Sequence, residues 1–142
     1  MNREIIYRGK SSVTNEWVYG SLVRVGNENH IIGFDEVDLD GHHIRYYSDR
    51  PVFTKQGTIG QFTGFYDKNC KEIYESDILQ LTIEKGKVLC IVTWNIEVGA
   101  WYLKLNGCKL EGIRTLGEWL RDSSTEIEMI GNIYDNKKLL ED

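Results

Sequence analysis

Proline and cysteine are scarce in this chain, which has one proline, three cysteines and 14 glycines among its 142 residues. The cysteines are odd in number and widely spaced, and no pair has the Cys-x-x-Cys spacing of a zinc knuckle or redox motif. A disulfide scaffold is therefore excluded, and Cys90, inside an apolar run, is expected in the core.

No apolar run is long enough to span a membrane and no signal-peptide core opens the chain. We therefore expect a reduced, cytoplasmic protein with no membrane partner.

Positive charge is also in deficit, with 17 Lys and Arg against 22 Asp and Glu, for a formal net charge of −5. No run of Lys or Arg marks a basic patch, whereas nucleic-acid binders usually gain affinity by neutralising phosphates with one. The charge balance therefore disfavours nucleic acid as the partner and leaves only a local patch open.

What the chain does contain is typical of β structure: 8 Tyr, 4 Trp and 4 Phe, with many β-branched residues. Asp40-Gly41 predicts a hairpin turn, and the segments 78–83 and 88–94 are expected to pair antiparallel. One further strand is expected to end at Asn106-Gly107. The full set of predicted strands is 17–25, 30–34, 44–47, 78–83, 88–94, 101–105 and 127–134.

One short helix is predicted after Thr115, because a hydroxyl at the cap and Glu118 three residues later form a capping box. Leu116, Trp119 and Leu120 then share one apolar face, which must pack on the sheet because two turns are unstable alone. We predict an all-β, mainly antiparallel, barrel-like fold with one or two short helices. It is expected to be a single domain, 1–142, with an N-terminal β portion (1–57) and a C-terminal barrel-like portion (58–142).

No catalytic constellation is recognisable. The chain has no Gly-x-Ser-x-Gly elbow, no Walker motif and no dinucleotide fingerprint. The glycine-rich stretch 57–64 lacks a phosphate-binding lysine, and its glycines are expected in turns or bulges. We therefore predict that the protein is not an enzyme and has no cofactor.

Metal ligation also finds little support. The acidic stretch 35–41 has partial calcium-loop spacing, but its twelfth position is Tyr47, which cannot supply the bidentate carboxylate. His42 and His43 are adjacent, so on a strand they would point to opposite faces. All three histidines are expected at the surface. A metal-dependent enzyme stays an alternative, and its candidate residues are Asp35, Asp38, His42 and His43.

Five aromatic residues lie on or beside predicted strands: Trp17, Tyr19, Trp94, Trp101 and Tyr102. If they face outward, they could stack the bases of single-stranded nucleic acid or anchor a protein partner. Each could equally fill the core, which is the commoner place for a single aromatic side chain.

A longer pattern lies between Thr58 and Ile78, which reads TIGQFTGFYDKNCKEIYESDI. It resembles the signature of the YopX family, small proteins of bacteriophages and prophages. Trp-Val-Tyr-Gly at 17–20, Val-Thr-Trp at 92–94 and Glu-Met-Ile-Gly-Asn-Ile-Tyr-Asp-Asn at 128–136 are similar to further family segments. The resemblance implies an all-β, barrel-like fold and a phage or prophage origin in a bacterial cytoplasm, and it implies no particular activity.

Two positions depart from the family pattern, because its usual glycines are Cys70 and Ser76 here. If Cys70 needs a positive φ, the side chain introduces strain. Most of the signature can be architectural, and its polar residues Gln61, Thr63 and Asp77 are the candidates for a further role. Asp77 at such a position more often caps a turn than performs chemistry.

The sequence thus predicts a non-enzymatic binding or accessory module that engages a host or phage protein. A small barrel that binds single-stranded nucleic acid is the alternative, and self-association is open because exposed strand edges invite pairing. The candidate binding surface comprises Trp17, Tyr19, Gln61, Thr63, Asp77, Trp94, Trp101 and Tyr102.

Overall fold

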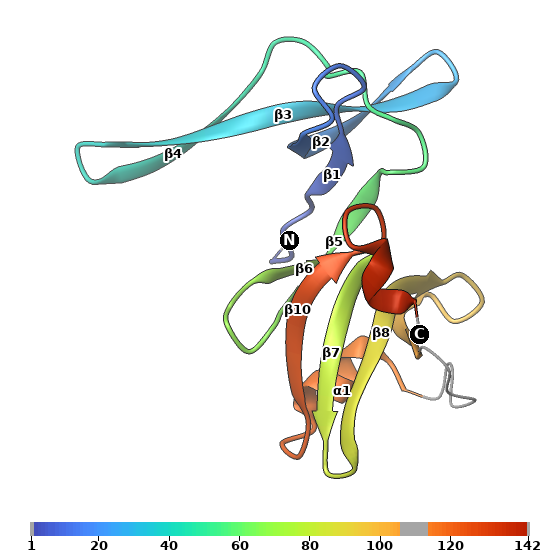
Figure 1. Cartoon of the computed structure of the whole chain (residues 1–142). Coiled ribbons are helices and arrows are strands. Elements are labelled where there is room, and N and C mark those ends of the chain that lie inside the picture. The colour runs from blue at the N-terminus through green and yellow to red at the C-terminus, as the bar shows by residue number, and fades with distance from the viewer. Residues whose placement is uncertain (1, 106–113, 142) are drawn as a thin grey trace. The chain divides into compact units, whose positions relative to one another are not determined.

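The computed structural model describes residues 2–105 and 114–141. The chain divides into two compact units, Met1–Phe62 and Thr63–Asp142. Both consist mainly of antiparallel strands (Figure 1), which confirms the predicted all-β class. The boundary between the units falls inside β5 (Gly60–Tyr66), so this strand contributes residues to both.

The first unit is a sheet in the order β4-β3-β2-β1, with the first residues of β5 paired to β1. Its strands are β1 (Tyr7–Lys10), β2 (Trp17–Val25), β3 (Glu28–Leu39) and β4 (His42–Tyr47). Asp40 and Gly41 have φ values of 48° and 78°, as a tight hairpin turn requires, so the predicted hairpin is confirmed. β3 is longer than the predicted 30–34 because its acidic second half pairs along all of β4.

Ile31 is fully buried in this unit, and a segment after β4 pairs with it. Val52 donates its N–H to the Ile31 carbonyl at 2.7 Å, and the Thr54 hydroxyl accepts the Ile31 N–H at 3.2 Å. His30 Nδ1 accepts the Thr54 N–H at 3.0 Å, and its ring packs edge-on to Phe53. His30 is therefore buried, and the surface position predicted for it is wrong, because Phe53 and Thr54 of the segment after β4 cover its ring.

The second unit contains the rest of β5, β6 (Glu72–Tyr74) and a four-stranded sheet in the order β10-β7-β8-β9. The four strands are β7 (Asp77–Ile83), β8 (Gly86–Asn95), β9 (Ala100–Leu105) and β10 (Glu126–Asn132). The antiparallel pairing predicted for 78–83 and 88–94 is confirmed. A 3-10 helix, η1 (Lys137–Leu140), follows β10. The predicted turn at Asn106-Gly107 lies outside the described residues, as does Cys108.

The sheet of the second unit is open, and the predicted barrel-like closure is wrong. Within residues 2–105 and 114–141, its outer strands β9 and β10 do not pair with each other. Four strands are too few to close around a packed interior, so the sheet buries its apolar face under a helix instead. Aromatic and β-branched composition predicts strands but carries no information about closure.

That helix is α1 (Leu116–Arg121), and its predicted capping box is confirmed. Glu118 donates its N–H to the Thr115 hydroxyl at 3.1 Å, and its carboxylate accepts the Thr115 N–H at 3.0 Å. Leu116 is fully buried and joins one apolar cluster with residues of the sheet. The buried members are Ile73, Leu79, Leu81, Cys90, Val92, Leu103, Leu105, Leu116 and Ile127. Burial raises the pKa of the Cys90 thiol to about 12, so this cysteine is an inert core residue, as predicted.

Candidate functional site

Two of the three polar candidate residues of the signature, Thr63 and Asp77, form side-chain hydrogen bonds to backbone groups. Thr63 is buried, donates its hydroxyl to the Ile73 carbonyl at 2.7 Å and accepts the Phe65 N–H at 3.1 Å. Asp77 is buried, and its carboxylate accepts the Tyr74 N–H at 2.7 Å across the turn between β6 and β7. Gln61 is half-buried on β5 opposite Tyr7. Thr63 and Asp77 thus satisfy backbone groups that would otherwise be buried without partners.

Asp67 has the same role over a longer range, and no local sequence pattern indicates it. One carboxylate oxygen accepts the Asn69 and Lys71 N–H groups at 2.8 and 2.9 Å, closing the turn after β5. The other accepts the Met129 N–H at 2.8 Å, although Met129 is 62 residues away on β10. Burial alone would raise the pKa of Asp67, but the N–H donors Met129, Lys71 and Asn69 outweigh it and hold the pKa below its ordinary value.

The two departures from the family pattern both adopt left-handed backbone. Cys70 has φ of 61° and Ser76 has φ of 71°. Ser76 is also a junction, because its N–H donates to the Val92 carbonyl at 2.9 Å and its carbonyl accepts the Ile133 N–H at 3.1 Å. The expected strain at Cys70 therefore has a structural basis, and Ser76 has the same one.

The closing segment that resembles the family is also architectural. The Asn132 side chain accepts the N–H groups of Tyr134 and Asp135 at 3.0 and 2.9 Å. Asn136 Oδ1 accepts the Asn132 N–H at 3.2 Å. A Cβ at Gly131 would lie 2.5 Å from that same Asn136 oxygen, so glycine is required for the side chain to close the turn.

The aromatic candidates fall into two groups, one in each unit. Trp17 and Tyr19 lie on β2 opposite Lys10 and Arg8. The Arg8 guanidinium is 4.5 Å from the centroid of the Trp17 ring, and the Lys10 amine is 5.3 Å from it. Trp17 is thus engaged in cation–π contacts, and a base could not stack on that ring face without displacing the cations.

Trp94 and Trp101 lie directly opposite each other where β8 and β9 meet their connecting turn. Their rings pack edge to face at 4.9 Å, and Trp101 in turn packs against the core cluster. Trp94 is 44% exposed. Trp101 therefore fixes the orientation of an aromatic ring that remains open to solvent.

The turn that follows Trp94 adds two apolar side chains, Ile96 at 85% exposure and Val98 at 60%. Asn95 orders this turn, because its side-chain oxygen accepts the N–H groups of Glu97 and Val98 at 3.0 and 3.2 Å. We call Trp94, Ile96 and Val98 the hairpin-end surface. Ile96 and Val98 are not among the residues predicted from the sequence, although apolar residues inside a turn were the available signal.

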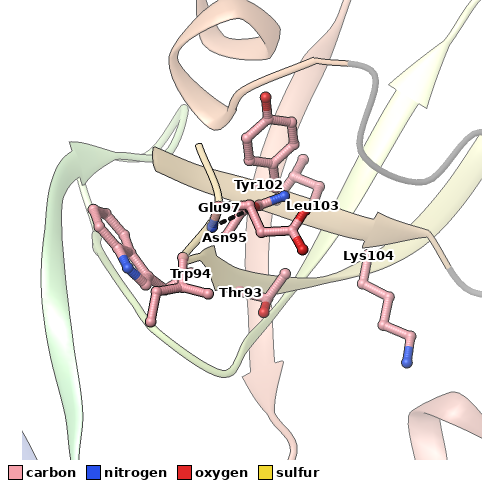
Figure 2. A pocket seen from close by; sticks show the side chains of 8 residues that line it. Thr93, Trp94, Asn95, Glu97, Tyr102, Leu103 and Lys104 are labelled. Carbon is pink, nitrogen blue, oxygen red and sulfur yellow. Dashed lines mark hydrogen bonds between the residues drawn. The ribbon is translucent and has the colours of Figure 1, made fainter. Parts of the chain in front are cut away.

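A cleft of about 430 Å³ lies along the same hairpin (Figure 2). Figure 2 shows Tyr102, Glu97 and Lys104 around it, with the Trp94 ring turned away from Tyr102. Tyr102 is half-buried and pairs with Thr93, whereas Trp94 pairs with Trp101, so the two side chains belong to opposite faces. The cleft lining comprises Thr93, Trp94, Asn95, Ile96, Glu97, Tyr102, Leu103 and Lys104.

The candidate metal residues are not assembled around one point. His42 and His43 open β4 opposite Leu39 and Asp38, so they lie on opposite faces of the hairpin. His43 bonds Asp38 at 2.9 Å and contacts Glu36 at 3.1 Å, and the Asp38 hydrogen bond is the main cause that raises the pKa of His43. Within the part of the chain that the structure describes, no group of three His, Cys, Asp or Glu side chains could hold a metal ion.

No described helix has the length and apolar character needed to cross a membrane.

A family model described as YopX protein matches residues 6–141 of this chain. Among solved structures, the crystal structure of protein EF1440 from Enterococcus faecalis is similar, with a TM-score of 0.60 and 21% sequence identity. That match covers 99% of this chain and 100% of the other, and at this identity it concerns the fold alone. No curated protein matches the chain.

Proposed function

The chain belongs to the YopX family, and from that premise we propose that it is an accessory protein of phage or prophage origin that binds a host or phage protein in the bacterial cytoplasm without catalysing a reaction. The observation that carries this proposal is the hairpin-end surface. An exposed tryptophan held by a second tryptophan and flanked by two exposed aliphatic residues is typical of a protein-binding hot spot. Its rigidity lowers the entropy lost on binding, because Trp101 already orients the Trp94 ring.

The absence of an assembled reaction centre in the described residues is consistent with binding. Thr63, Asp67 and Asp77, the polar residues that first suggest chemistry, bond backbone groups instead. The cleft beside the hairpin brings a carboxylate and an amine near a tyrosine, without a histidine or cysteine among its lining residues. These observations support a binding role over an enzymatic one.

A protein partner fits the charge better than a nucleic acid does. The chain carries a net charge of −5, and Glu97 lies within the exposed turn of the hairpin-end surface. A single base could stack on Trp94, but a strand of nucleic acid also needs cations along its phosphates. Single-strand binding therefore stays the second candidate, supported by the exposed Trp94 ring alone.

A tagged pull-down from host cells, with and without nuclease, tests the proposal. We expect a protein partner that survives nuclease and is lost with Trp94→Ala, whose affinity should fall about 100-fold, as for a typical hot-spot tryptophan. Lys104→Ala, on the opposite face of the same hairpin, is the matched control and should keep the partner.

Recovery of nucleic acid alone, or partners lost with nuclease, would favour the single-strand binder. Stoichiometric metal in the purified protein would favour the enzyme alternative.

A further inference from the structure

The second half of β3 and all of β4 form a two-stranded ribbon, residues 34–47, which we call the arm. β2 pairs with β3 only as far as Gly33, so residues 34–39 of β3 pair with β4 alone. Figure 1 shows the arm continuing beyond β2 as a long hairpin. An isolated two-stranded ribbon is marginally stable in water and usually needs a third strand or a helix packed on it.

On one face of the arm, charged and aromatic side chains contact one another. Three cross-strand pairs lie on it: Phe34 with Tyr47, Glu36 with Arg45, and Asp38 with His43. Arg45 donates to Glu36 at 2.7 Å and also to Glu4. Its guanidinium lies 4.1 Å from the Phe34 ring centroid, so this charged face already has partners for its polar groups.

The other face is apolar and uncovered. It carries Val37 opposite Ile44, Leu39 opposite His42, and Tyr46 opposite Asp35. Leu39 and Tyr46 are each 53% exposed, and Ile44 is 41% exposed. Contiguous exposed apolar side chains on a ribbon of this kind are a mark of an interaction surface.

The free edge of β4 is less suited to a partner than this face. Ser48 donates its N–H to the Gly33 carbonyl, which makes 33 and 48 a hydrogen-bonded pair and points the N–H groups of His43, Arg45 and Tyr47 outward. A second copy pairing along this edge would bring Arg45 and His43 against the same residues. Charged side chains of this kind protect edges from strand pairing.

The charge of the arm defines the partner. It contains four acidic residues and only one arginine. Glu36 and Asp38 are paired on the charged face, whereas Asp35, at one end of the apolar face, and Asp40, at the tip, have no ion-pair partner among the described residues. A second copy packed against the apolar face would bring its own Asp35 and its acidic tip to a face that carries no Lys or Arg, so a basic partner is favoured over a second copy.

The width of the face favours a helix. Two strands span about 10 Å with their spacing of roughly 4.8 Å, which matches the diameter of an α-helix. Asp35 and Asp40 are five residues apart, about 17 Å along a strand, which corresponds to about 11 helical residues. The chain uses the same solution in its second unit, where Leu116 of α1 packs on a sheet.

We propose that the apolar face of the arm binds an amphipathic helix of a protein partner, with its apolar stripe on Leu39, Ile44 and Tyr46 and a Lys or Arg at each end facing Asp35 and Asp40. The interaction shares with the proposed function only the premise that the partner is a protein. It uses a different surface, in the other unit, from the hairpin-end surface.

The test uses the full chain and synthetic helical peptides of about 15 residues. The first carries leucines on one face and a lysine at positions i and i+11 of that face. A second replaces both lysines with glutamate, and a third has the same composition with its leucines distributed around the helix. We expect the first peptide to bind at least about tenfold more tightly than either control, with NMR shift changes centred on Val37, Leu39 and Ile44.

Variants locate the surface. Ile44→Asp should weaken binding of the first peptide about tenfold or more, and Asp35→Asn about threefold, whereas Trp94→Ala should leave it unchanged. Because Ile44 is partly exposed, the ribbon's integrity is checked by the His43 resonance, which reports the bond to Asp38 on the charged face. Equal binding of the three peptides, shift changes away from the arm, or self-association abolished by Ile44→Asp would each overturn the proposal. None of these outcomes bears on the hairpin-end surface, which is tested by Trp94→Ala in the pull-down.

Discussion

The signature region and the arm contain similar polar residues but use them in opposite ways. In the signature region, Asp67 and Asp77 are buried and accept backbone N–H groups. In the arm, Glu36 and Arg45 lie toward solvent and bond each other. A buried carboxylate that satisfies backbone groups is strongly coupled to folding, whereas an exposed ion pair contributes little. The buried polar residues of the signature therefore belong to the frame of the fold, and the hairpin-end surface and the arm both lie outside the stretch 58–78.

Removing Asp67 should give the largest effect. Asp67→Ala leaves the N–H groups of Asn69, Lys71 and Met129 without their acceptor, and we expect a loss of about 3 kcal/mol in the free energy of unfolding. Urea denaturation measures it. Asp38→Ala in the arm is the matched carboxylate deletion and should leave the midpoint almost unchanged. Equal losses in the two variants would contradict the contrast between frame and arm.

The same carboxylate also predicts a pH dependence. Since the pKa of Asp67 is lower in the folded chain than its ordinary value of 3.8, the unfolded chain binds the proton more readily. The stabilisation is therefore complete above about pH 5 and is lost as the pH falls below 4 through the folded pKa. Denaturation at pH 3 and pH 7 should show this loss in the wild type and a smaller one in Asp67→Asn. An unchanged pH dependence in the variant would contradict the role given to Asp67.

A methyl group at Gly131 should have the next largest effect. The added Cβ would lie 2.5 to 2.9 Å from three atoms of Asn136, which must then leave the Asn132 N–H. We expect Gly131→Ala to lower the free energy of unfolding by about 2 kcal/mol. Gly41→Ala in the arm is less informative about packing, since no atom beyond its chain neighbours lies within 4 Å of its Cβ position and only its φ of 78° opposes a side chain. If Gly131→Ala costs little in an Asn136→Ala background, its cost in the wild type is the clash with Asn136; an equal cost in both backgrounds would contradict the packing account of Gly131.

Restoring glycine at the two strained positions should be stabilising. Cys70→Gly and Ser76→Gly remove a side chain from left-handed backbone, and we expect each to raise the free energy of unfolding by about 1 kcal/mol. Thermal denaturation of both single variants and the double variant measures it. Cys90→Ala is the contrasting cysteine substitution and should destabilise, because that side chain is buried. A fall in stability with both glycine variants would show that the side chains contribute more than the strain costs.

The smallest expected effect lies in the arm. The hydrogen bond to Asp38 and the charge of Glu36 raise the pKa of His43 above its ordinary value of 6.5. Any stabilisation of the arm by these contacts is complete below pH 6.5 and is lost as the pH rises through the raised pKa that His43 has in the folded chain. An NMR titration should give a lower His43 pKa in Asp38→Asn than in the wild type, with no change in overall unfolding. An identical pKa in the two proteins would show that the pair does not form in solution.

Local patterns predicted much of the fold. Trp17–Val25 is a strand over the predicted residues, and Thr115 caps the helix through Glu118 as expected. The predicted strand 30–34 is too short, because the acidic residues of 35–40 resemble a solvated loop. In the structure, pairing with β4 makes residues 35–39 part of β3. The glycines of the stretch 57–64 are predicted to lie in turns or bulges. Gly57 and Gly64 do have positive φ, but Gly60–Tyr66 is β5.

The candidate site was less accessible to sequence reasoning. Trp94 was selected and lies at the exposed end of the hairpin, but its neighbours Ile96 and Val98 were not. Whether Asp67 bonds Met129 depends on a pairing over 62 residues, which no local pattern encodes. Exposure of one aromatic rather than another depends on which face of the sheet is covered, and that is fixed only by packing.

The most direct test of the division between the frame and the proposed binding surfaces is photo-crosslinking in host cells. A photoreactive amino acid is placed, one position at a time, at Trp94, at Ile44 and at Asn69, an exposed residue of the signature. We expect crosslinks to protein from Trp94 and Ile44 and none from Asn69. Crosslinks from Asn69 with none from the other two would contradict the account, because the signature would then be the binding surface.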